Sequence, residues 1–262
     1  TLTAGPGCGK TALMEILAEA LKGKDFTFMG PTGKSAKVLS NRLRSHGMSA
    51  STIHSALRGA SAAEFTVNEE EPLGSDVVVV DESSMADLGL ADGVLAAVKS
   101  SAHLILLGDP DQLPSIAPGN FLRDLLRVKS VDHYRLDTTH RNQGGILDLI
   151  KQVRGGKIDC VNSEGVTFSR LLGDARTQEG EIVSRYINAV GKHGFHDVAL
   201  LISKRKGDAN EPEWNTTYFN AVLRDLCNPD AQRIPGTKLH VGDRIIVKAN
   251  MAVARAGQGA KE

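Results

Sequence analysis

Short apolar segments alternate with amphipathic segments along this chain, and the alternation predicts an α/β fold with a parallel sheet flanked by helices. In the segment 11–22, apolar side chains recur at spacings of three and four residues, which is typical of a helix with one buried face. The segment 77–80 is apolar at every position, as expected of a strand covered on both faces. Further helices are predicted over 34–45, 146–154 and 214–226, and further strands over 1–3, 26–29, 104–107, 198–202 and 244–248.

Two stretches interrupt this alternation. Residues 58–75 are polar and acidic, and they predict either a small hairpin that projects from the sheet or a solvated loop. Paired glycines at 144–145 and 155–156 favour a domain boundary in their neighbourhood. We therefore expect a first domain over residues 1–140 and a second over residues 141–262.

A glycine-rich segment directly follows the first predicted strand. Residues 4–11, Ala-Gly-Pro-Gly-Cys-Gly-Lys-Thr, have the spacing of a Walker A loop, with Ala4 in place of the first glycine. Glycines let backbone N–H groups turn toward phosphate oxygens, and the helix that follows presents its positive end to the same anion. Lys10 would reach the β- and γ-phosphates, and the Thr11 hydroxyl would hold Mg²⁺. The residues expected to bind the nucleotide are Gly5, Pro6, Gly7, Cys8, Gly9, Lys10 and Thr11.

A second turn of this kind follows the strand predicted at 26–29. Residues 30–35, Gly-Pro-Thr-Gly-Lys-Ser, have too few residues between their glycines to form a Walker A loop. The turn still opens a basic helix, so its Lys34 and the helix N–H groups suit a phosphate of another molecule.

Acidic and amide side chains follow two further predicted strands. Asp81 and Glu82 come directly after the apolar segment 77–80, and Gln112 follows the strand predicted at 104–107. Because ligands of open α/β sheets collect at the carboxyl ends of the strands, we expect these groups to lie near the Walker A loop. Asp81 would then hold a metal, Glu82 would polarise water, and Gln112 would contact the water and the γ-phosphate.

Charge is balanced over the whole chain but not locally. The 262 residues include 31 Lys and Arg and 31 Asp and Glu, which excludes a polybasic nucleic-acid-binding tail. Residues 22–44 carry six basic side chains and one acidic side chain, a local charge of +5, whereas residues 64–82 carry seven acidic and no basic ones. The basic stretch favours contact with nucleic acid, although Arg42 and Arg44 fit a solvated face at least as well.

Composition also limits the compartment and the cofactors. The three cysteines lie far apart and form no Cys-x-x-Cys pair, which argues against a disulfide framework or a zinc site and is typical of the reducing cytoplasm. No apolar run approaches the roughly 18 residues of a membrane span, so we expect no membrane partner. Aromatic residues make up 4% of the chain, so extensive base stacking is not expected.

Taken in order, the motifs resemble those of the superfamily 1 DNA helicases, most closely the RecD-like branch (the exodeoxyribonuclease V alpha-subunit type). Residues 30–36 resemble the motif with which that family contacts the nucleic-acid backbone, and Ser51-Thr52-Ile53-His54 resembles its Ser/Thr-x-His motif. Further similar segments are Asp81-Glu82-Ser83-Ser84-Met85, the family's Gly-Asp-x-x-Gln-Leu-Pro at residues 108–114, and its Tyr-Arg-Gln at His140-Arg141-Asn142. Residues 220–229 and 241–244 resemble its second core domain.

The resemblance implies a P-loop NTPase of the RecA-like kind, with a first ATP-binding domain over 1–140 and part of a second over 141–262. It implies a DNA-repair and recombination motor that hydrolyses ATP with Mg²⁺ and moves on single-stranded DNA, usually 5′ to 3′, with other subunits of a helicase–nuclease complex as further partners. The residues it assigns are Lys10, Glu82, Gln112 and Arg141 for catalysis, Thr11 and Asp81 for the metal, and Thr32, Gly33, Lys34, Ser35, Thr52 and His54 for nucleic acid.

The chain departs from the family's pattern at both ends. The adenine-recognition segment before the Walker A loop and the late Gln-Gly and Thr-Arg-Ala motifs are absent, which resembles a truncated chain. We expect nucleotide binding to survive such a truncation better than coupled unwinding. Three alternatives stay open: an RNA helicase of the same superfamily, another P-loop phosphotransferase, and a non-catalytic nucleic-acid-binding subunit. Gln112 and the basic helix argue against a kinase, and the intact Lys10, Thr11, Asp81 and Glu82 argue against a non-catalytic subunit.

Overall fold

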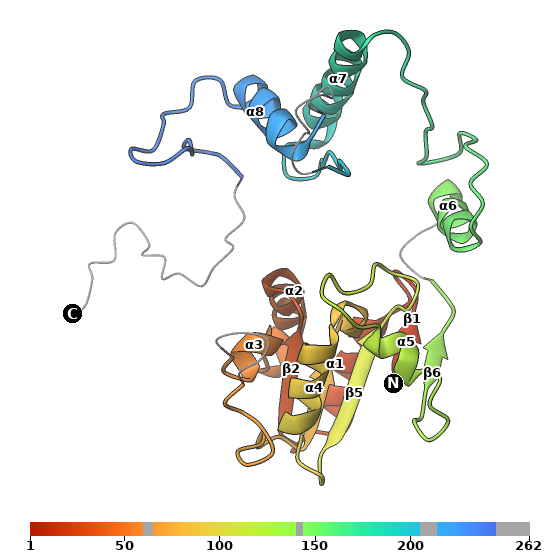
Figure 1. The fold of residues 1–262 in the computed structure, drawn as a ribbon, viewed down its shortest axis with the longest axis vertical. Helices are drawn as coiled ribbons and strands as arrows, with labels where there is room; N and C mark the ends of the chain where they lie inside the picture. The colour runs from red at the N-terminus through yellow and green to blue at the C-terminus, as the bar shows by residue number, and fades with distance from the viewer. Residues whose placement is uncertain (60–64, 140–143, 205–213, 245–262) are drawn as a thin grey trace. The chain divides into compact units, whose positions relative to one another are not determined.

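The computed structural model describes residues 1–59, 65–139, 144–204 and 214–244, and Figure 1 traces their elements. The chain divides into two compact units, Thr1–Phe168 and Ser169–Glu262. The first unit therefore extends beyond residue 140, where the sequence analysis expects its first domain to end. None of the helices within the described ranges is both long and apolar enough to cross a bilayer.

The first unit is built on a six-stranded sheet with the order β3-β2-β4-β5-β1-β6, and its strands pair in parallel throughout. This confirms the predicted parallel α/β fold. The strands of this sheet are β1 (Leu2–Ala4), β2 (Phe26–Gly30), β3 (Ala50–Thr52), β4 (Val77–Val80), β5 (His103–Gly108) and β6 (Tyr134–Leu136).

Helices cover both faces of this sheet, as its strand sequences require. Successive side chains of a strand point to opposite faces, so Val78 and Val80 of β4 pack into one apolar cluster while Val77 and Val79 pack into the other. The first cluster also holds residues of α3 (Ile53–Ala56), α4 (Leu88–Ala97) and α5 (Phe121–Leu125). The second holds residues of α1 (Lys10–Ala20) and α2 (Gly33–Leu43). All four β4 valines are buried, which confirms the prediction drawn from their uniform apolarity.

The acidic stretch after α3 is a loop over the part that the structure describes. Residues 65–75 contain bends but no strand, so the predicted hairpin is not found there, and residues 60–64 lie outside the described ranges. The loop is only partly solvated, because Val67 is buried and donates its N–H to the carbonyl oxygen of Leu57 at 3.2 Å. Phe65 and Leu73 pack against the same apolar cluster, so the loop covers one edge of the core.

The first unit also contains α6 (Gly144–Arg154), and the second unit contains α7 (Ala175–His193) and α8 (Thr216–Cys227). Asp174 and Asn215 cap these last two helices by accepting N–H hydrogen bonds from Thr177 and Tyr218. The strand predicted over 198–202 is wrong: these residues form no strand, and Leu201 is 91% exposed. A strand needs a neighbour to pair with, and no strand occurs among the described residues of this unit. Of the strand predicted over 244–248, all but residue 244 lies outside the described ranges.

Candidate nucleotide-binding site

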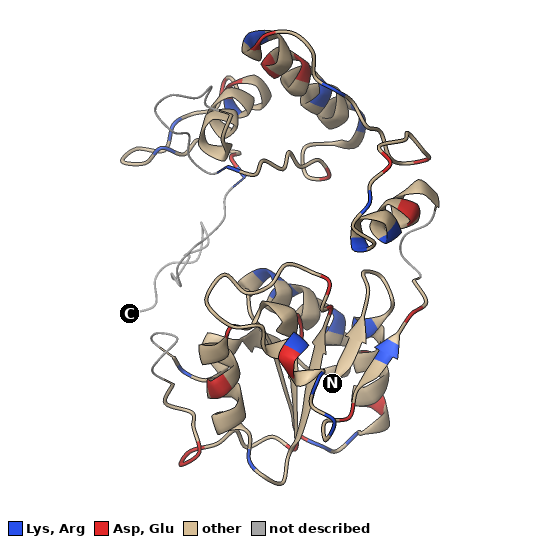
Figure 2. Ribbon diagram, turned by 45° about the vertical axis from the view of Figure 1, so that its right-hand side comes forward, with Lys and Arg blue, Asp and Glu red and all other residues tan. Residues whose placement is uncertain are grey.

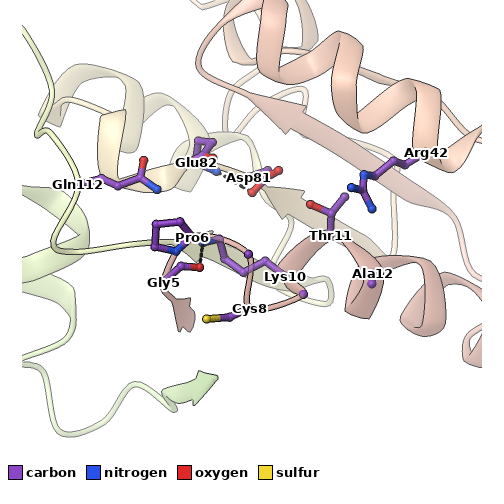
Figure 3. Close-up of a pocket in the computed structure, with 12 residues that line it drawn as sticks. Gly5, Pro6, Cys8, Lys10, Thr11, Ala12, Arg42, Asp81, Glu82 and Gln112 are labelled. Carbon is purple, nitrogen blue, oxygen red and sulfur yellow. Dashed lines mark hydrogen bonds between the residues drawn. The ribbon is translucent and has the colours of Figure 1, made fainter. Parts of the chain in front are cut away.

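Three neighbouring strands send the predicted site residues to one edge of the sheet. Strands β4, β5 and β1 are adjacent and parallel, so the segments that follow Val80, Gly108 and Ala4 leave the sheet at the same edge. Together these segments line a cavity of about 300 Å³ (Figure 3). Its lining consists of Gly5, Pro6, Gly7, Cys8, Gly9, Lys10, Thr11, Ala12, Arg42, Asp81, Glu82 and Gln112.

The loop after β1 has the backbone that its glycines allow. Gly7 and Gly9 adopt φ angles of 75° and 86°, a region that side chains with a Cβ rarely occupy, and Gly9 is the residue from which α1 begins. The first turn of α1 therefore directs its free N–H groups toward the cavity, which favours an anion there. The Nζ atom of Lys10 lies 2.6 Å from the carbonyl oxygen of Ala4 and 3.4 Å from that of Gly5.

The two acids after β4 lie at the opposite wall of the cavity. Asp81 is 9% exposed, and its Oδ1 accepts the N–H of Glu82 at 2.9 Å. Glu82 adopts the left-handed backbone conformation, with φ 52° and ψ 38°, which is uncommon for a residue other than glycine and costs free energy. Among the described residues, the Oε2 atom of Glu82 is buried without a hydrogen-bond partner. A buried carboxylate oxygen of this kind suits a ligand or a water molecule in the cavity.

Burial sets the electrostatics of this acidic pair. It raises the pKa of Asp81 above its ordinary value, while the Glu82 N–H and the Lys10 ammonium lower it. Burial also raises the pKa of Glu82, and the charges of Asp81 and Asp109 raise it further against the effect of Lys10. A cation that enters the cavity therefore stabilises the ionised form of both carboxylates. Oxygen ligands on Asp81 and Thr11, which point toward one another in Figure 3, suit a hard divalent cation such as Mg²⁺.

The turn after β5 completes the lining with Gln112. The carbonyl oxygen of Asp109 accepts the N–H of Gln112 at 3.1 Å, and Oδ1 of Asp109 accepts the N–H of Asp111 at the same distance. Gly108 allows this turn to approach the acids, because a methyl group there would lie 2.8 Å from Oγ of Ser83 and 3.1 Å from the backbone N of Ser84. The Gln112 side chain points toward the acids in Figure 3.

Arg42 lines the cavity, although the sequence indicates for it only a contact with nucleic acid or a place on a solvated face. It comes from α2 and lies beside Thr11 and Ala12, with its Nη1 atom 3.7 Å from Oε1 of Glu15 on α1. Its place in the cavity depends on the packing of α1 against α2, which no local sequence pattern reports. Arg42 adds a second positive charge to the lining beside that of Lys10.

The residues predicted to contact nucleic acid form a separate group at the ends of β2 and β3. These strands pair in parallel with Gly30 opposite Thr52, so the turns that follow them are neighbours. Thr32 caps α2 in a capping box with Ser35, and Thr52 caps α3 by accepting the N–H of Ser55 at 3.1 Å. Thr32, Gly33 and Lys34 are exposed, whereas Ser35, Thr52 and His54 are half-buried, and none of the six lines the cavity. Arg141 lies outside the described residues.

A Walker A loop after β1 and paired acids after β4, on a parallel sheet with helices on both faces, define a P-loop NTPase fold of the RecA-like kind. The chain belongs to the AAA domain family, whose model matches residues 1–174.

Relatives named RecD or RecD2 match nearly the whole chain. It is 37% identical to the RecBCD enzyme subunit RecD of Mycolicibacterium smegmatis over an alignment of 291 residues. This alignment covers 95% of this chain and 51% of that protein. It is 41% identical to the ATP-dependent RecD2 DNA helicase of Deinococcus radiodurans over an alignment of 257 residues, and this alignment covers 95% of this chain and 33% of that protein. The similarity to RecD-like helicases that the motifs indicate is thus confirmed, and the chain spans about half or less of these relatives' length.

Among solved structures, Bacteroides Pif1 bound to ssDNA matches with a TM-score of 0.46 and 17% identity, covering 60% of this chain and 42% of that one.

Proposed function

We propose that this chain is part of an ATP-dependent DNA helicase, in which the first unit binds and hydrolyses MgATP to drive movement on single-stranded DNA. One observation carries the proposal: Lys10, Thr11, Asp81, Glu82 and Gln112, which come from three strand ends, line the same cavity. Relatives named as helicase subunits or helicases, at 37% and 41% identity, support the same activity. Since this chain covers 51% and 33% of those proteins, we propose the motor activity for the whole protein that contains this sequence.

In this proposal the loop residues Gly5 to Thr11 hold the phosphates through backbone N–H groups, and Lys10 balances the charge of the terminal phosphates. Thr11 and Asp81 hold Mg²⁺, which when bound neutralises charge that develops on the phosphates. Glu82 accepts a proton from the attacking water, for which its unpartnered Oε2 is available.

Gln112 hydrogen-bonds the water and the terminal phosphate, and Arg141 stabilises the charge on that phosphate.

Single-stranded DNA is the proposed partner, bound at the ends of β2 and β3 by Thr32, Gly33, Lys34, Ser35, Thr52 and His54. The exposed Lys34 and the N-terminus of α2 offer a cation and free N–H groups to a phosphate. Basic and acidic residues occur along the ribbon of both units (Figure 2), so attraction to DNA depends on this local group rather than on overall charge. The proposal also includes movement from 5′ to 3′ and association with other subunits of a helicase–nuclease complex. It places the protein in the cytoplasm. The free state of all three cysteines is compatible with that location.

The decisive experiment measures ATP hydrolysis by this chain and by its full-length protein, with and without single-stranded DNA. Stimulation of the full-length protein by DNA supports the motor and separates it from another P-loop phosphotransferase, which would transfer phosphate to a small molecule. Absence of hydrolysis under every condition would favour a non-catalytic subunit. Competition between DNA and RNA oligonucleotides of the same sequence distinguishes a DNA helicase from an RNA helicase.

A further inference from the structure

The last residue of α6 contacts two parts of the candidate site from outside the cavity. Nη2 of Arg154 lies 2.6 Å from Oδ2 of Asp109, and Nη1 lies 3.6 Å from Oδ2 of Asp111. The same guanidinium packs over the loop after β1, because a methyl group built on Gly5 would lie 3.2 Å from both Nη atoms. One side chain therefore joins α6, the turn after β5 and the start of the phosphate-binding loop.

The Arg154 contact matters because its partner is buried. The side chain of Asp109 is only 2% exposed, whereas that of Arg154 is 29% exposed. A carboxylate removed from water is strongly destabilised unless a cation and hydrogen bonds compensate its charge. Arg154 supplies the cation, and the backbone N–H of Asp111 supplies a hydrogen bond to the other oxygen.

Asp109 in turn holds the backbone that carries Gln112. Its carbonyl oxygen accepts the N–H of Gln112, and its carboxylate accepts the N–H of Asp111. The Asp109 carboxylate therefore restrains this turn through the N–H of Asp111. A guanidinium suits this task better than an ammonium, because its planar fork can contact Asp109 and Asp111 at once.

We propose that Arg154 is a positioning residue for phosphate hydrolysis, which fixes the turn 109–112 against the phosphate-binding loop so that Gln112 faces the terminal phosphate. The inference rests on the proposed hydrolysis of ATP at this cavity. Arg154 does not line the cavity, so it acts through Asp109 and Gln112 and not on the substrate. Displacement of such a group by about 1 Å is enough to lower a rate by up to about 100-fold.

The test uses four variants of the full-length protein: R154A, R154K, the double variant R154A/D109N, and R127A as a matched control. Arg127 is a suitable control because its side chain is 80% exposed and pairs with Asp124 on the surface. R154A should lower kcat for ATP by about 10- to 100-fold while KM changes less than about threefold. R154K should keep the thermal stability close to that of the wild type but recover only part of kcat. R127A should leave kcat and the thermal stability unchanged.

The double variant separates positioning from charge compensation. R154A leaves the buried Asp109 charge without its cation, so this variant should unfold more easily, and the added D109N change removes that charge. We expect R154A/D109N to recover stability but not kcat. Recovery of kcat along with stability, or an R154A variant with normal kcat, would overturn the proposal. If R154A does not fold, R154K and the double variant decide the question in the same way.

Hydrogen exchange gives a readout that does not depend on hydrolysis. The amides of Asp111 and Gln112 should exchange about 10-fold faster in R154A than in the wild type, and unchanged exchange would contradict the proposal. A wild-type protein without ATPase activity would defeat the proposed function, and the exchange rates would still show whether Arg154 holds this turn.

Discussion

The ammonium group of Lys10 lies 2.6 Å from the carbonyl oxygen of Ala4, so the side chain folds back over its own loop. A bound phosphate would draw the ammonium away from this carbonyl, because the ammonium forms a stronger, charge-assisted hydrogen bond with a phosphate oxygen.

Removal of this ammonium should therefore weaken nucleotide binding. In K10A we expect the affinity for a labelled ATP analogue to fall about 10- to 100-fold, as for the loss of one hydrogen bond between charged groups. K22A is the control, because Lys22 is exposed beyond the end of α1 and does not line the cavity. Equal affinities of K10A and the wild type would reject the assignment of the loop.

Replacement of Glu82 by Gln should slow hydrolysis and also stabilise the protein in the absence of metal and nucleotide. The pKa of Glu82 is raised in the folded protein, so folding favours its protonated form. Such a carboxyl contributes stability below its unfolded pKa of about 4.3, and this contribution is lost as the pH rises through the folded value. The Gln side chain cannot ionise, so the E82Q variant keeps this contribution to stability as the pH rises.

Thermal unfolding in a chelator at two pH values checks this expectation. E82Q should melt at a higher temperature than the wild type at pH 7, and the difference should disappear near pH 4. A variant that melts lower at pH 7 would contradict the raised pKa of Glu82, and one that hydrolyses ATP at the normal rate would remove Glu82 from its proposed role as proton acceptor.

A methyl group at Gly108 should damage the site without touching the cavity lining. It would lie 2.5 Å from Cδ2 of Leu122 and 3.1 Å from the backbone N of Ser84, so β5 and the segment after Glu82 would have to separate. Overpacking of this kind costs about 1–3 kcal/mol of unfolding free energy. Denaturant titration should give that loss for G108A and almost none for G74A, where an added methyl group meets no atom within 4 Å.

Lys34 should contribute to DNA binding through charge. If it neutralises one phosphate, K34A should weaken binding of single-stranded DNA and reduce the slope of log affinity against log salt by about 0.7. K129A is the control, because Lys129 is exposed in the segment between α5 and β6, at the opposite edge of the sheet. A slope that does not change in K34A would exclude a phosphate contact at this position.

The sequence predicts the parts of this fold whose signals are local. The four valines of β4 and the apolar stripe of α1 allow only one plausible structure each. The short edge strands β3 and β6 were missed because Ala50-Ser51-Thr52 and Tyr134-Arg135-Leu136 have mixed polarity, and they become strands only by pairing with β2 and β1. Helix α7 was missed although Ile182, Tyr186 and Val190 recur at a helical spacing of four residues, because its first part, residues 175–181, contains no large apolar side chain.

In the candidate site, too, the residues with a local sequence signal could be predicted and those placed by helix packing could not. Lys10, Asp81 and Gln112 could be predicted to lie together, because each follows a strand and parallel strands end at one edge. Arg42 and Arg154 could not, because they reach the site from helices whose packing depends on the whole unit.

The order β4-β5-β1 has a consequence for attempts to transplant this site. Since neighbouring strands are about 4.8 Å apart, the loop after β1 and the acids after β4 are separated by about 10 Å at the level of the sheet. That gap is fixed by the intervening backbone of β5, and no side-chain substitution can change it. A designer who grafts these motifs onto another scaffold must therefore copy three strands in this order, because two adjacent strands would bring the acids about 5 Å closer to the loop at the level of the sheet.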